Sequence, residues 1–551
     1  MDLNLQIKIK KAHSTLSHKE TDLLIEFESI YSLFRSHSEK AKEKTAYTYY
    51  EENQKTISYT FEQFDQKIIQ FSQYLKSAGL TYGDRIATAG YNHPDLIITY
   101  ISAWKNGLCI VPLNMGEDDN RLEYILSNSK PKLIVALEKE FEKINSLKPE
   151  LNIVLNTNIH KFDIRTEEEI DNGKLSGSDA LLIYTSGTTG NPKGVILNQY
   201  NLAVDAKYIT DWFGITSKDV VMTVLPIHHV NGTVVTHVAP IIAGSSIILL
   251  KKFSANHFFE IAKKENVTVS SVVPTLLQFL IQTEFQIDDI KTNLRFLICG
   301  AGPLTVELAL KFEEKFKIPV MHGYGLSETT CYSCFLPANL TQEEHKMWLG
   351  EFGFPSIGIP IQSNDMDIQD DSGNSLSELE KGEIVIRGHN VMKEYYDNEE
   401  ANRNAFEFGW FRSGDEGFYK LDEKGRKFFF ITGRFKELII RGGINLSPLE
   451  IDEVINKCPG VKAGISVAFD NDWYGEEVGA YIQKSNQDLT ETEVIAYCAI
   501  HLPFMKQPKA VIFGENIPVT STGKFQRNKV KHLFTEWKTV QFKETRKTKK
   551  V

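Results

Sequence analysis

The chain has few cysteines for its length, and their spacing matches no disulfide or metal pattern. Six cysteines are scattered over 551 residues. Cys331 and Cys334 form an isolated C-x-x-C pair, without the second pair or the nearby histidine pair that a zinc site needs. We therefore expect reduced thiols, as in a cytoplasmic protein, and no disulfide framework.

Long apolar runs are also missing. The first ten residues mix charged and apolar side chains, which argues against a signal peptide. The longest stretch without Asp, Glu, Lys or Arg is residues 220–250, and it contains His228, His229, His237 and two prolines. A buried helix and strand explain this stretch better than a transmembrane segment does.

An excess of positive charge is absent as well. The formal net charge is −10 and the pI is near 5.9, which disfavours a nucleic-acid binder and suits a soluble enzyme. The length and the 42% hydrophobic content predict two or more domains.

What the sequence does contain is an alternation of helical and strand-like segments. Apolar residues recur with helical spacing at residues 59–80 and 94–107, and strand patterns occur at residues 83–89, 108–112, 132–136, 245–250, 267–273 and 294–299. This alternation predicts parallel sheets covered by helices. Residues 359–430 instead show short strands and turns, which predicts a β-rich unit. A new set of elements follows, so we place a domain boundary at about Lys436.

A loop rich in glycine and hydroxyl groups interrupts the apolar run at residues 182–195. Its glycines allow backbone N–H groups to approach an anion, its hydroxyls add donors, and Lys193 adds a positive charge. The loop differs from the Walker pattern, because Pro192 precedes the lysine and Gly194 follows it. A P-loop NTPase is therefore disfavoured. The simpler alternative is a surface turn between two strands.

Two segments follow apolar runs and carry groups that suit a nucleotide. Residues 300–304 and 322–330 are expected at the carboxyl ends of strands, where ligands bind in α/β sheets. In the second segment Tyr324 can stack on a base, Ser327 can reach a phosphate and Glu328 can hold a magnesium ion.

Further polar groups lie elsewhere in the chain. Residues 225–232 place two imidazoles in an apolar segment, Asp415 can accept hydrogen bonds from a ribose diol, and residues 433–443 combine cations with a glycine pair. Each feature alone has a simpler interpretation. The two imidazoles can be core histidines, Glu328 can cap a helix and Asp415 can form an Asx turn. Lys524, near the end of the chain, can be an ordinary exposed lysine.

Taken together, in this order and at these spacings, the segments resemble the adenylate-forming (AMP-binding) superfamily, in its branch of acyl-CoA synthetases and fatty-acid–CoA ligases. The resemblance implies an α/β fold: a large N-terminal domain of two doubly wound α/β subdomains plus a small β-barrel, and a smaller mobile α+β C-terminal domain. The implied division is an N-terminal extension (1–28), an AMP-binding domain (29–435), a C-terminal domain (436–534) and a basic tail (535–551).

The resemblance also implies the reaction. A carboxylate attacks the α-phosphate of ATP, held with Mg²⁺, to give acyl-AMP and pyrophosphate, and a thiol then takes the acyl group. Such catalysis depends on positioning and on neutralising phosphate charge. The residues implied for nucleotide binding are Thr185, Ser186, Gly187, Thr188, Thr189, Lys193, Gly300, Ala301, Gly302, His322, Gly323, Tyr324, Asp415 and Arg434.

The catalytic residues come from the same resemblance. Ser327 is implied to contact the α-phosphate and Glu328 to bind Mg²⁺. His229 is implied to close over the carboxylate pocket. Lys524, from the C-terminal domain, is implied to bridge the carboxylate and the α-phosphate in the first half-reaction.

A rotation of the small domain is implied between the two half-reactions. Lys436 matches the hinge of the family, and the rotation would replace Lys524 with the segment that contains Gly442 and Gly443. These glycines leave room for a pantetheine arm.

The sequence leaves more than one possibility for the carboxylic acid substrate and for the thiol that accepts the acyl group. Fatty, aryl and small functionalised acids all suit the expected pocket, whereas an amino acid is disfavoured. His228 departs from the apolar residue usual at its position. CoA is the expected acceptor, and the phosphopantetheine of a carrier protein is the alternative. A luciferase-like monooxygenase and a non-catalytic binding module are disfavoured. The expected pocket lining is His229, Asn231, Val273, Cys299, Leu326, Thr330 and Ser333.

Overall fold

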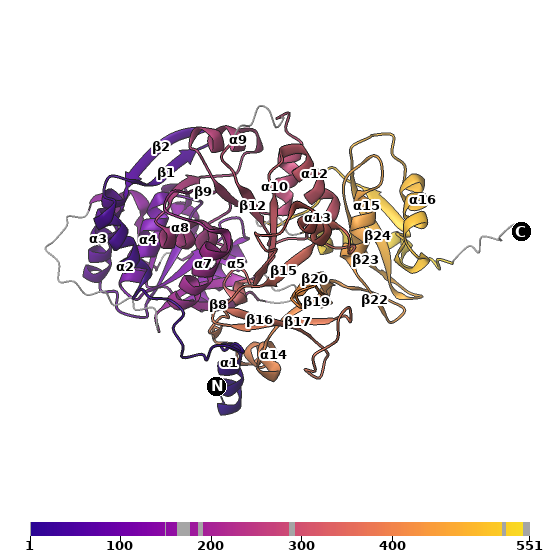
Figure 1. Cartoon of the computed structure of the whole chain (residues 1–551), viewed down its shortest axis with the longest axis horizontal. Coiled ribbons are helices and arrows are strands. Elements are labelled where there is room, and N and C mark those ends of the chain that lie inside the picture. Colours follow the sequence, from indigo (N-terminus) through magenta and orange to yellow (C-terminus); the bar gives the residue numbers. More distant parts are fainter. Residues whose placement is uncertain are drawn as a thin grey trace, which may run out of the picture.

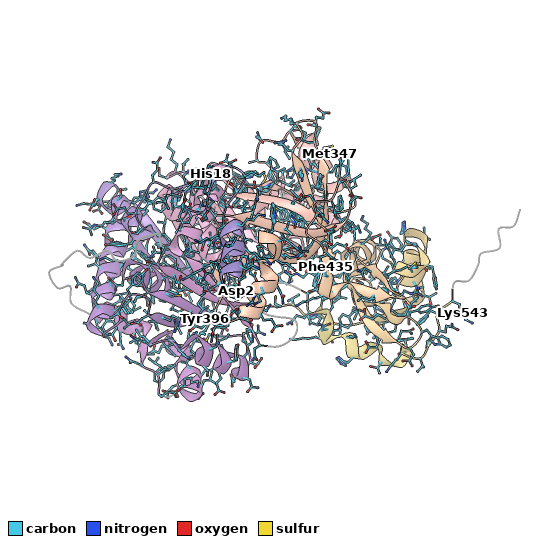
Figure 2. The ribbon with its side chains drawn as sticks, turned by 90° about the horizontal axis from the view of Figure 1, so that it is seen from below. Asp2, His18, Met347, Tyr396, Phe435 and Lys543 are labelled. Carbon is cyan, nitrogen blue, oxygen red and sulfur yellow. The ribbon has the colours of Figure 1, made fainter. Side chains whose placement is uncertain are left out.

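The protein, obtained as a computed structural model, has a large N-terminal domain and a smaller C-terminal domain (Figure 1). The structure describes residues 2–148, 150–161, 177–185, 191–285, 292–520 and 525–543. The chain passes between the domains in a short turn, η6 (Phe435–Glu437), and Phe435 lies where the two domains meet (Figure 2).

The first α/β sheet of the large domain has seven strands in the order β18-β8-β7-β4-β3-β5-β6. Its central pairs are parallel with helices between successive strands, as the alternating pattern predicts. Its elements are β3 (Arg85–Ala89), β4 (Cys109–Leu113), β5 (Leu133–Ala136), β6 (Ile153–Leu155), β7 (Asp179–Thr185), β8 (Lys193–Asn198) and β18 (Glu394–Tyr395), with α3 (Phe61–Ser77), α4 (Pro94–Lys105), α5 (Asp119–Ser129) and α6 (Phe141–Leu147).

The second sheet has 13 strands, and its parallel part runs β13-β12-β11-β9-β10-β1. This part contains the strands predicted at residues 245–250, 267–273 and 294–299. Its elements are β1 (Thr45–Glu51), β2 (Gln54–Thr60), β9 (Val220–Thr223), β10 (Ser246–Leu250), β11 (Val269–Val272), β12 (Phe296–Cys299) and β13 (Val320–Tyr324), with α2 (Ile30–Lys40), α7 (Gln199–Phe213), α8 (Ala239–Ala243), α9 (Ala255–Lys264), α10 (Pro274–Ile281) and α12 (Val306–Phe316).

The β-rich unit predicted at residues 359–430 continues this second sheet beyond β13 as antiparallel strands. Its elements are β14 (Cys334–Phe335), β15 (Ser356–Pro360), β16 (Asn364–Gln369), β17 (Gly382–Gly388), β19 (Phe411–Leu421) and β20 (Lys427–Arg434), with α13 (Gln342–Gly350) and α14 (Glu399–Ala405). At Gly358 the backbone has φ +85° and lies so close to β14 that an added Cβ would fall 1.8 Å from the Phe335 carbonyl oxygen.

The uncharged stretch at residues 220–250 is folded into the core. It forms β9, the buried π-helix η3 (Asn231–Val238), α8 and β10. Among the described residues, no helix has the length and apolarity needed to cross a bilayer. The buried helix and strand predicted for this stretch are therefore confirmed.

The N-terminal extension packs along the large domain. It begins with α1 (Leu3–Ala12), which contacts β17 and the turn η5 (Glu407–Gly409). An imidazole nitrogen of His13 lies 2.8 Å from the Met392 carbonyl oxygen, and the Leu24 N–H donates to the Tyr200 hydroxyl at 3.1 Å. These contacts join the extension to the segment that precedes β18 and to α7.

The C-terminal domain is a five-stranded sheet with two α-helices among its described residues. Its strands are β21 (Ile439–Arg441), β22 (Ile444–Leu446), β23 (Val461–Asn471), β24 (Gly475–Lys484) and β25 (Ala510–Phe513), and its helices are α15 (Pro448–Asn456) and α16 (Glu491–His501). The remaining short helices among the described residues are η1 (Glu138–Glu140), η2 (Asn156–Lys161), η4 (Ser327–Thr329), η7 (Phe504–Lys506), η8 (Arg527–Lys529) and η9 (Lys531–Trp537).

The close approach at Gly358 gives a prediction about the β-rich unit. Gly353 has a similar φ of +81° but open space around it, so Gly353→Ala carries the backbone strain alone, about 1 kcal/mol. Gly358→Ala adds a clash with backbone atoms, and we expect it to cost at least about 2 kcal/mol more in denaturant unfolding. Equal losses in the two variants would contradict the packing described here.

Candidate active site

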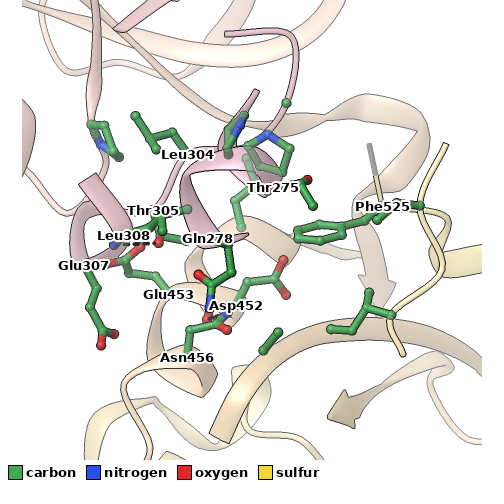
Figure 3. A pocket seen from close by; sticks show the side chains of 18 of the residues that line it. Thr275, Gln278, Leu304, Thr305, Glu307, Leu308, Asp452, Glu453, Asn456 and Phe525 are labelled. Atoms are coloured by element: carbon green, nitrogen blue, oxygen red, sulfur yellow. Dashed lines mark hydrogen bonds between the residues drawn. The ribbon is translucent and has the colours of Figure 1, made fainter. Parts of the chain in front are cut away.

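A cavity of about 460 Å³ lies between the two domains (Figure 3). On the side of the large domain it is lined by residues that the sequence had singled out for adenine and ribose binding. These are Ala301, Gly302, His322, Gly323, Tyr324, Asp415 and Arg434. They come from the end of β12, from β13 and from the pair β19 and β20, so the fold brings together segments more than a hundred residues apart.

The C-terminal domain forms the opposite wall of the cavity. Figure 3 shows Asp452, Glu453 and Asn456 of α15 opposite Gln278 and the start of α12. The Val306 N–H donates to the Glu453 carboxylate at 3.2 Å, which places a negative charge at the N-terminus of α12. This contact, together with the Gln278 side chain donating to the Lys462 carbonyl oxygen at 3.2 Å, ties the small domain to the large one.

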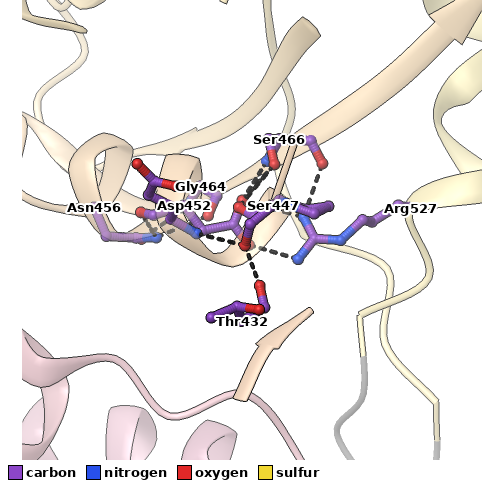
Figure 4. A network of polar contacts seen from close by, with 9 residues as sticks. Thr432, Ser447, Asp452, Asn456, Gly464, Ser466 and Arg527 are labelled. Atoms are coloured by element: carbon purple, nitrogen blue, oxygen red, sulfur yellow. Dashed lines mark hydrogen bonds and ion pairs between the residues drawn. The ribbon is translucent and has the colours of Figure 1, made fainter. Parts of the chain in front are cut away.

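A buried polar network anchors the chain on the carboxyl side of Lys524 (Figure 4). Arg527 forms an ion pair with Asp452, which also accepts hydrogen bonds from Ser466. Lys524 itself lies outside the described residues. Its described neighbours Val519 and Phe525 both line the cavity, which brings this part of the C-terminal domain to the nucleotide side.

Gly300, the first residue of the adenine slot predicted at residues 300–302, packs closely against Tyr332 and the backbone of β13. A Cβ at Gly300 would lie 2.6 Å from the Tyr332 hydroxyl and 2.8 Å from the Gly323 carbonyl oxygen, so no larger residue fits. Ala301 has φ +61°, a conformation that is rare outside glycine. Burial lowers the pKa of His322 to about 4, so its imidazole is neutral near pH 7. Because a carbonyl oxygen can only accept, the His322 Nδ1 carries the proton and donates to the Ser356 carbonyl oxygen at 2.9 Å.

The ribose site predicted at Asp415 is a buried carboxylate with two partners. Asp415 and Arg434 face each other across β19 and β20, and the Arg434 Nε lies 2.8 Å from one carboxylate oxygen. The Tyr324 hydroxyl donates to the other oxygen at 2.6 Å. The sequence suggested a stacking role for Tyr324, and the structure adds this hydrogen bond through its hydroxyl.

The loop rich in glycine and hydroxyl groups, called the phosphate loop below after its predicted role, connects the antiparallel strands β7 and β8. Thr185 ends β7 and pairs with Lys193 at the start of β8. The intervening predicted residues Ser186, Gly187, Thr188 and Thr189 lie outside the described residues. A strand follows the loop, whereas a Walker loop leads into a helix, so the topology agrees with the exclusion of a P-loop.

Glu328 lies beside this hairpin, on the turn η4 together with Ser327. The Tyr395 hydroxyl donates to the Glu328 carboxylate at 2.8 Å, and the Lys193 ammonium lies 4.9 Å from the centroid of the Tyr395 ring. Tyr395 was not predicted from the sequence, because nothing in its local pattern distinguishes it from the adjacent Tyr396.

Some of the residues predicted to line the acid pocket form polar contacts with one another and with their neighbours. The Asn231 amide donates to the Tyr332 hydroxyl at 3.1 Å and accepts from the Ser271 hydroxyl at 2.7 Å. The other predicted lining residues Val273, Cys299, Thr330 and Ser333 are buried, whereas Leu326 is half-buried. Tyr332 and Ser271 were not predicted, since serine and tyrosine are common in buried strands without any role in binding.

The two histidines of this pocket differ in their surroundings. Their ring centroids lie 4.5 Å apart, and His229 is the more exposed of the two. His228 is buried, and neither of its ring nitrogens has a hydrogen-bond partner among the described residues. Burial lowers the pKa of His228 to about 4.

The residues predicted for the second half-reaction lie apart from the cavity. Lys436 is exposed on η6, and Gly442 and Gly443 form the exposed turn between β21 and β22. Lys436 nevertheless lies between Arg434 and Glu437, which both line the cavity. Several other predicted residues that the structure describes are likewise not among its lining residues: Thr185, Lys193, His229, Gly300, Ser327 and Glu328.

The fold and the cavity define a two-domain α/β protein with a cavity at the domain junction, where the sequence predicts a nucleotide. Residues 34–396 match the AMP-binding enzyme family, and residues 450–524 match its C-terminal domain. The chain belongs to this family.

Similar proteins agree with this assignment. The oxalate–CoA ligase of Arabidopsis thaliana is 32% identical over 84% of this chain and 91% of its own length. The sulfoacetate–CoA ligase of Cupriavidus necator is 30% identical over 82% and 88%. The ATP-bound structure of MatB from Rhodopseudomonas palustris superimposes with a TM-score of 0.81 at 26% identity, covering 92% of this chain and 99% of that one. Ligases named for a long-chain fatty acid and for ferulate also match.

The chain is therefore an AMP-forming acid–thiol ligase. It adenylates a carboxylic acid with ATP, releasing pyrophosphate, and transfers the acyl group to CoA, releasing AMP.

The ribose role predicted for Asp415 has a direct test. Asp415→Asn removes the charge that pairs with Arg434, and each lost charge-assisted hydrogen bond is worth about 1.5–3 kcal/mol. We expect ATP to bind at least about 10-fold more weakly in calorimetry, with a smaller loss for Tyr324→Phe, which removes one hydrogen bond. Unchanged ATP affinity in Asp415→Asn would contradict the assignment.

Proposed function

We propose that this ligase activates a small polar carboxylic acid, and that the residues around the domain junction divide the work as follows. The phosphate loop and Lys193 neutralise the pyrophosphate that leaves, while Ser327 holds the α-phosphate. Asp415 and Arg434 fix the ribose. His229 closes over the pocket of the attacking carboxylate, and Lys524 bridges that carboxylate and the α-phosphate.

Magnesium fits the carboxylate of Glu328. Mg²⁺ prefers oxygen ligands and is commonly held by one or two carboxylates plus substrate phosphates. No cluster of three or more histidine, cysteine or acidic side chains that could enclose a metal occurs in the part of the chain that the structure describes, which agrees with such a shared site. When bound, the ion would neutralise charge on the phosphates of ATP.

The main support for a small polar acid is the imidazole of His228, whose ring nitrogens have no hydrogen-bond partner among the described residues. A buried polar group without a partner costs about 1–3 kcal/mol, and a hydrocarbon tail in the pocket would leave it unpaired. A second polar group on the acid could pair with it. The buried Ser333 hydroxyl likewise has no partner among the described residues. The similar ligases named for oxalate and sulfoacetate support the same choice.

A substrate panel tests this proposal. Pyrophosphate release is measured with dicarboxylic, sulfonated, hydroxylated, fatty and aryl acids, and thioester formation is then followed by mass spectrometry with CoA and with a holo carrier protein. We expect the highest kcat/KM with a small polar acid and with CoA. A fatty or aryl acid as the best substrate would contradict the acid class, and transfer only to the carrier protein would contradict CoA.

The division of roles between the half-reactions predicts opposite defects in two variants. Lys524→Ala removes the cation at the attacked phosphate, so we expect acyl-AMP formation to fall by at least about 100-fold while transfer from supplied acyl-AMP to CoA is largely kept. Lys436→Pro restricts the hinge and should do the reverse. Equal loss of both half-reactions in each variant would contradict this division.

His228→Phe gives a prediction for the acid pocket. The phenyl ring removes both ring nitrogens, so we expect kcat/KM for the best polar acid to fall at least about 10-fold relative to a matched apolar acid. His228→Asn keeps a polar group and serves as the control, with a smaller change in preference. The KM for ATP should stay unchanged in both variants. A polar preference kept in His228→Phe would refute the role of this imidazole.

A further inference from the structure

Tyr395 contacts two groups of the phosphate site at once. Its hydroxyl donates to Glu328 at 2.8 Å, and its ring face lies 4.9 Å from the Lys193 ammonium. The side chain is buried, with 7% of its surface exposed. A single aromatic residue therefore touches both the carboxylate proposed to bind magnesium and the cation proposed to bind pyrophosphate.

The backbone around Tyr395 is held from both sides. In β18, Tyr395 pairs with Val195 of β8, two residues from Lys193. The Asn402 side chain accepts a hydrogen bond from the Tyr395 N–H at 2.7 Å and donates to its carbonyl oxygen at 2.9 Å. This pairing fixes where the ring can lie.

The same short segment also holds the backbone of Glu328 and of Gly194, the residue after Lys193. The Met392 N–H donates to the Glu328 carbonyl oxygen at 2.7 Å, and the Tyr396 N–H donates to the Gly194 carbonyl oxygen at 2.7 Å. The main chain on either side of Tyr395 thus bonds to both η4 and the β7–β8 hairpin. The side chain of Tyr395 contacts Glu328 on η4 and Lys193 on the hairpin.

We propose that Tyr395 is a positioning residue that orients Glu328 for magnesium and supports Lys193 for the pyrophosphate. This inference rests on the proposed roles of Glu328 and Lys193. The hydroxyl is neutral, so it occupies one carboxylate oxygen without cancelling the negative charge of Glu328, and the other oxygen stays available. Groups that hold a metal ligand in this way usually affect metal affinity by about 10–100-fold. The ring face attracts a cation by its quadrupole.

Two substitutions separate the two contacts. Tyr395→Phe removes the hydrogen bond to Glu328 and keeps the ring beneath Lys193. Tyr395→Leu removes both. Tyr396→Phe is the matched control, because this neighbour has no contact with Glu328 or Lys193 among the interactions of the described residues. Circular dichroism and thermal unfolding show whether each variant folds.

The readout is equilibrium binding of ATP, followed by calorimetry without acid or CoA, in a magnesium titration and in the presence of a chelator. For Tyr395→Phe we expect the magnesium concentration at half-maximal effect to rise about 10-fold, while metal-free ATP binding stays within about 2-fold of the wild type. For Tyr395→Leu we expect metal-free ATP binding to weaken several-fold as well.

The possible failures can be told apart. If magnesium does not strengthen ATP binding to the wild-type enzyme, the proposed metal role of Glu328 is wrong, and the inference about Tyr395 falls with it. If magnesium acts on the wild type and Tyr395→Phe titrates identically, only the positioning role is refuted. A folded Tyr395→Leu variant with unchanged metal-free affinity would refute the support of Lys193.

Discussion

The ion pair between Asp415 and Arg434 is the interaction on which the arrangement of the site depends. A buried carboxylate is costly without a partner, and Asp415 has both the guanidinium and the Tyr324 hydroxyl. Arg434 is also the last residue of β20, directly before the turn into the C-terminal domain. Together with Tyr324, the pair therefore connects β13, the β-rich unit and the start of the domain linker.

The position of the small domain follows from contacts on the other side of the cavity. Glu453 of α15 accepts from the N-terminus of α12, where the partial positive charge of the helix favours a carboxylate. Asp452, one residue earlier, is paired with Arg527. Glu453 thus joins the small domain to the large one, and its neighbour Asp452 holds Arg527, three residues after Lys524. Gly442 and Gly443 are not among the residues that line the cavity. On the roles proposed for Lys524 and for this glycine turn, the arrangement of the two domains seen here would serve the adenylate-forming half of the reaction.

The α/β class could be predicted from the sequence, because it depends on local patterns. The nucleotide roles of the site residues, which came from the family resemblance, stay predictions. Apolar runs ending in glycine and hydroxyl residues mark strand ends, and the segments around Ala301, Tyr324 and Asp415 do meet in one cavity. Contacts between distant segments were not predictable. Tyr395 joins Glu328 to Lys193 only through the pairing of β18 with β8, and Glu453 meets α12 only when the domains are docked. No local spacing encodes either contact.

The central claim, that this docking of the small domain serves adenylation and must be released for transfer to CoA, has a direct measurement. Cysteines at Gln278 and Lys462, which meet across the domain junction, can be joined by a short bismaleimide while the native cysteines are buried. The cross-linked enzyme should release pyrophosphate and retain acyl-AMP in a single turnover, but form no acyl-CoA. Formation of acyl-CoA by the cross-linked enzyme at the rate of the uncross-linked one would contradict the account.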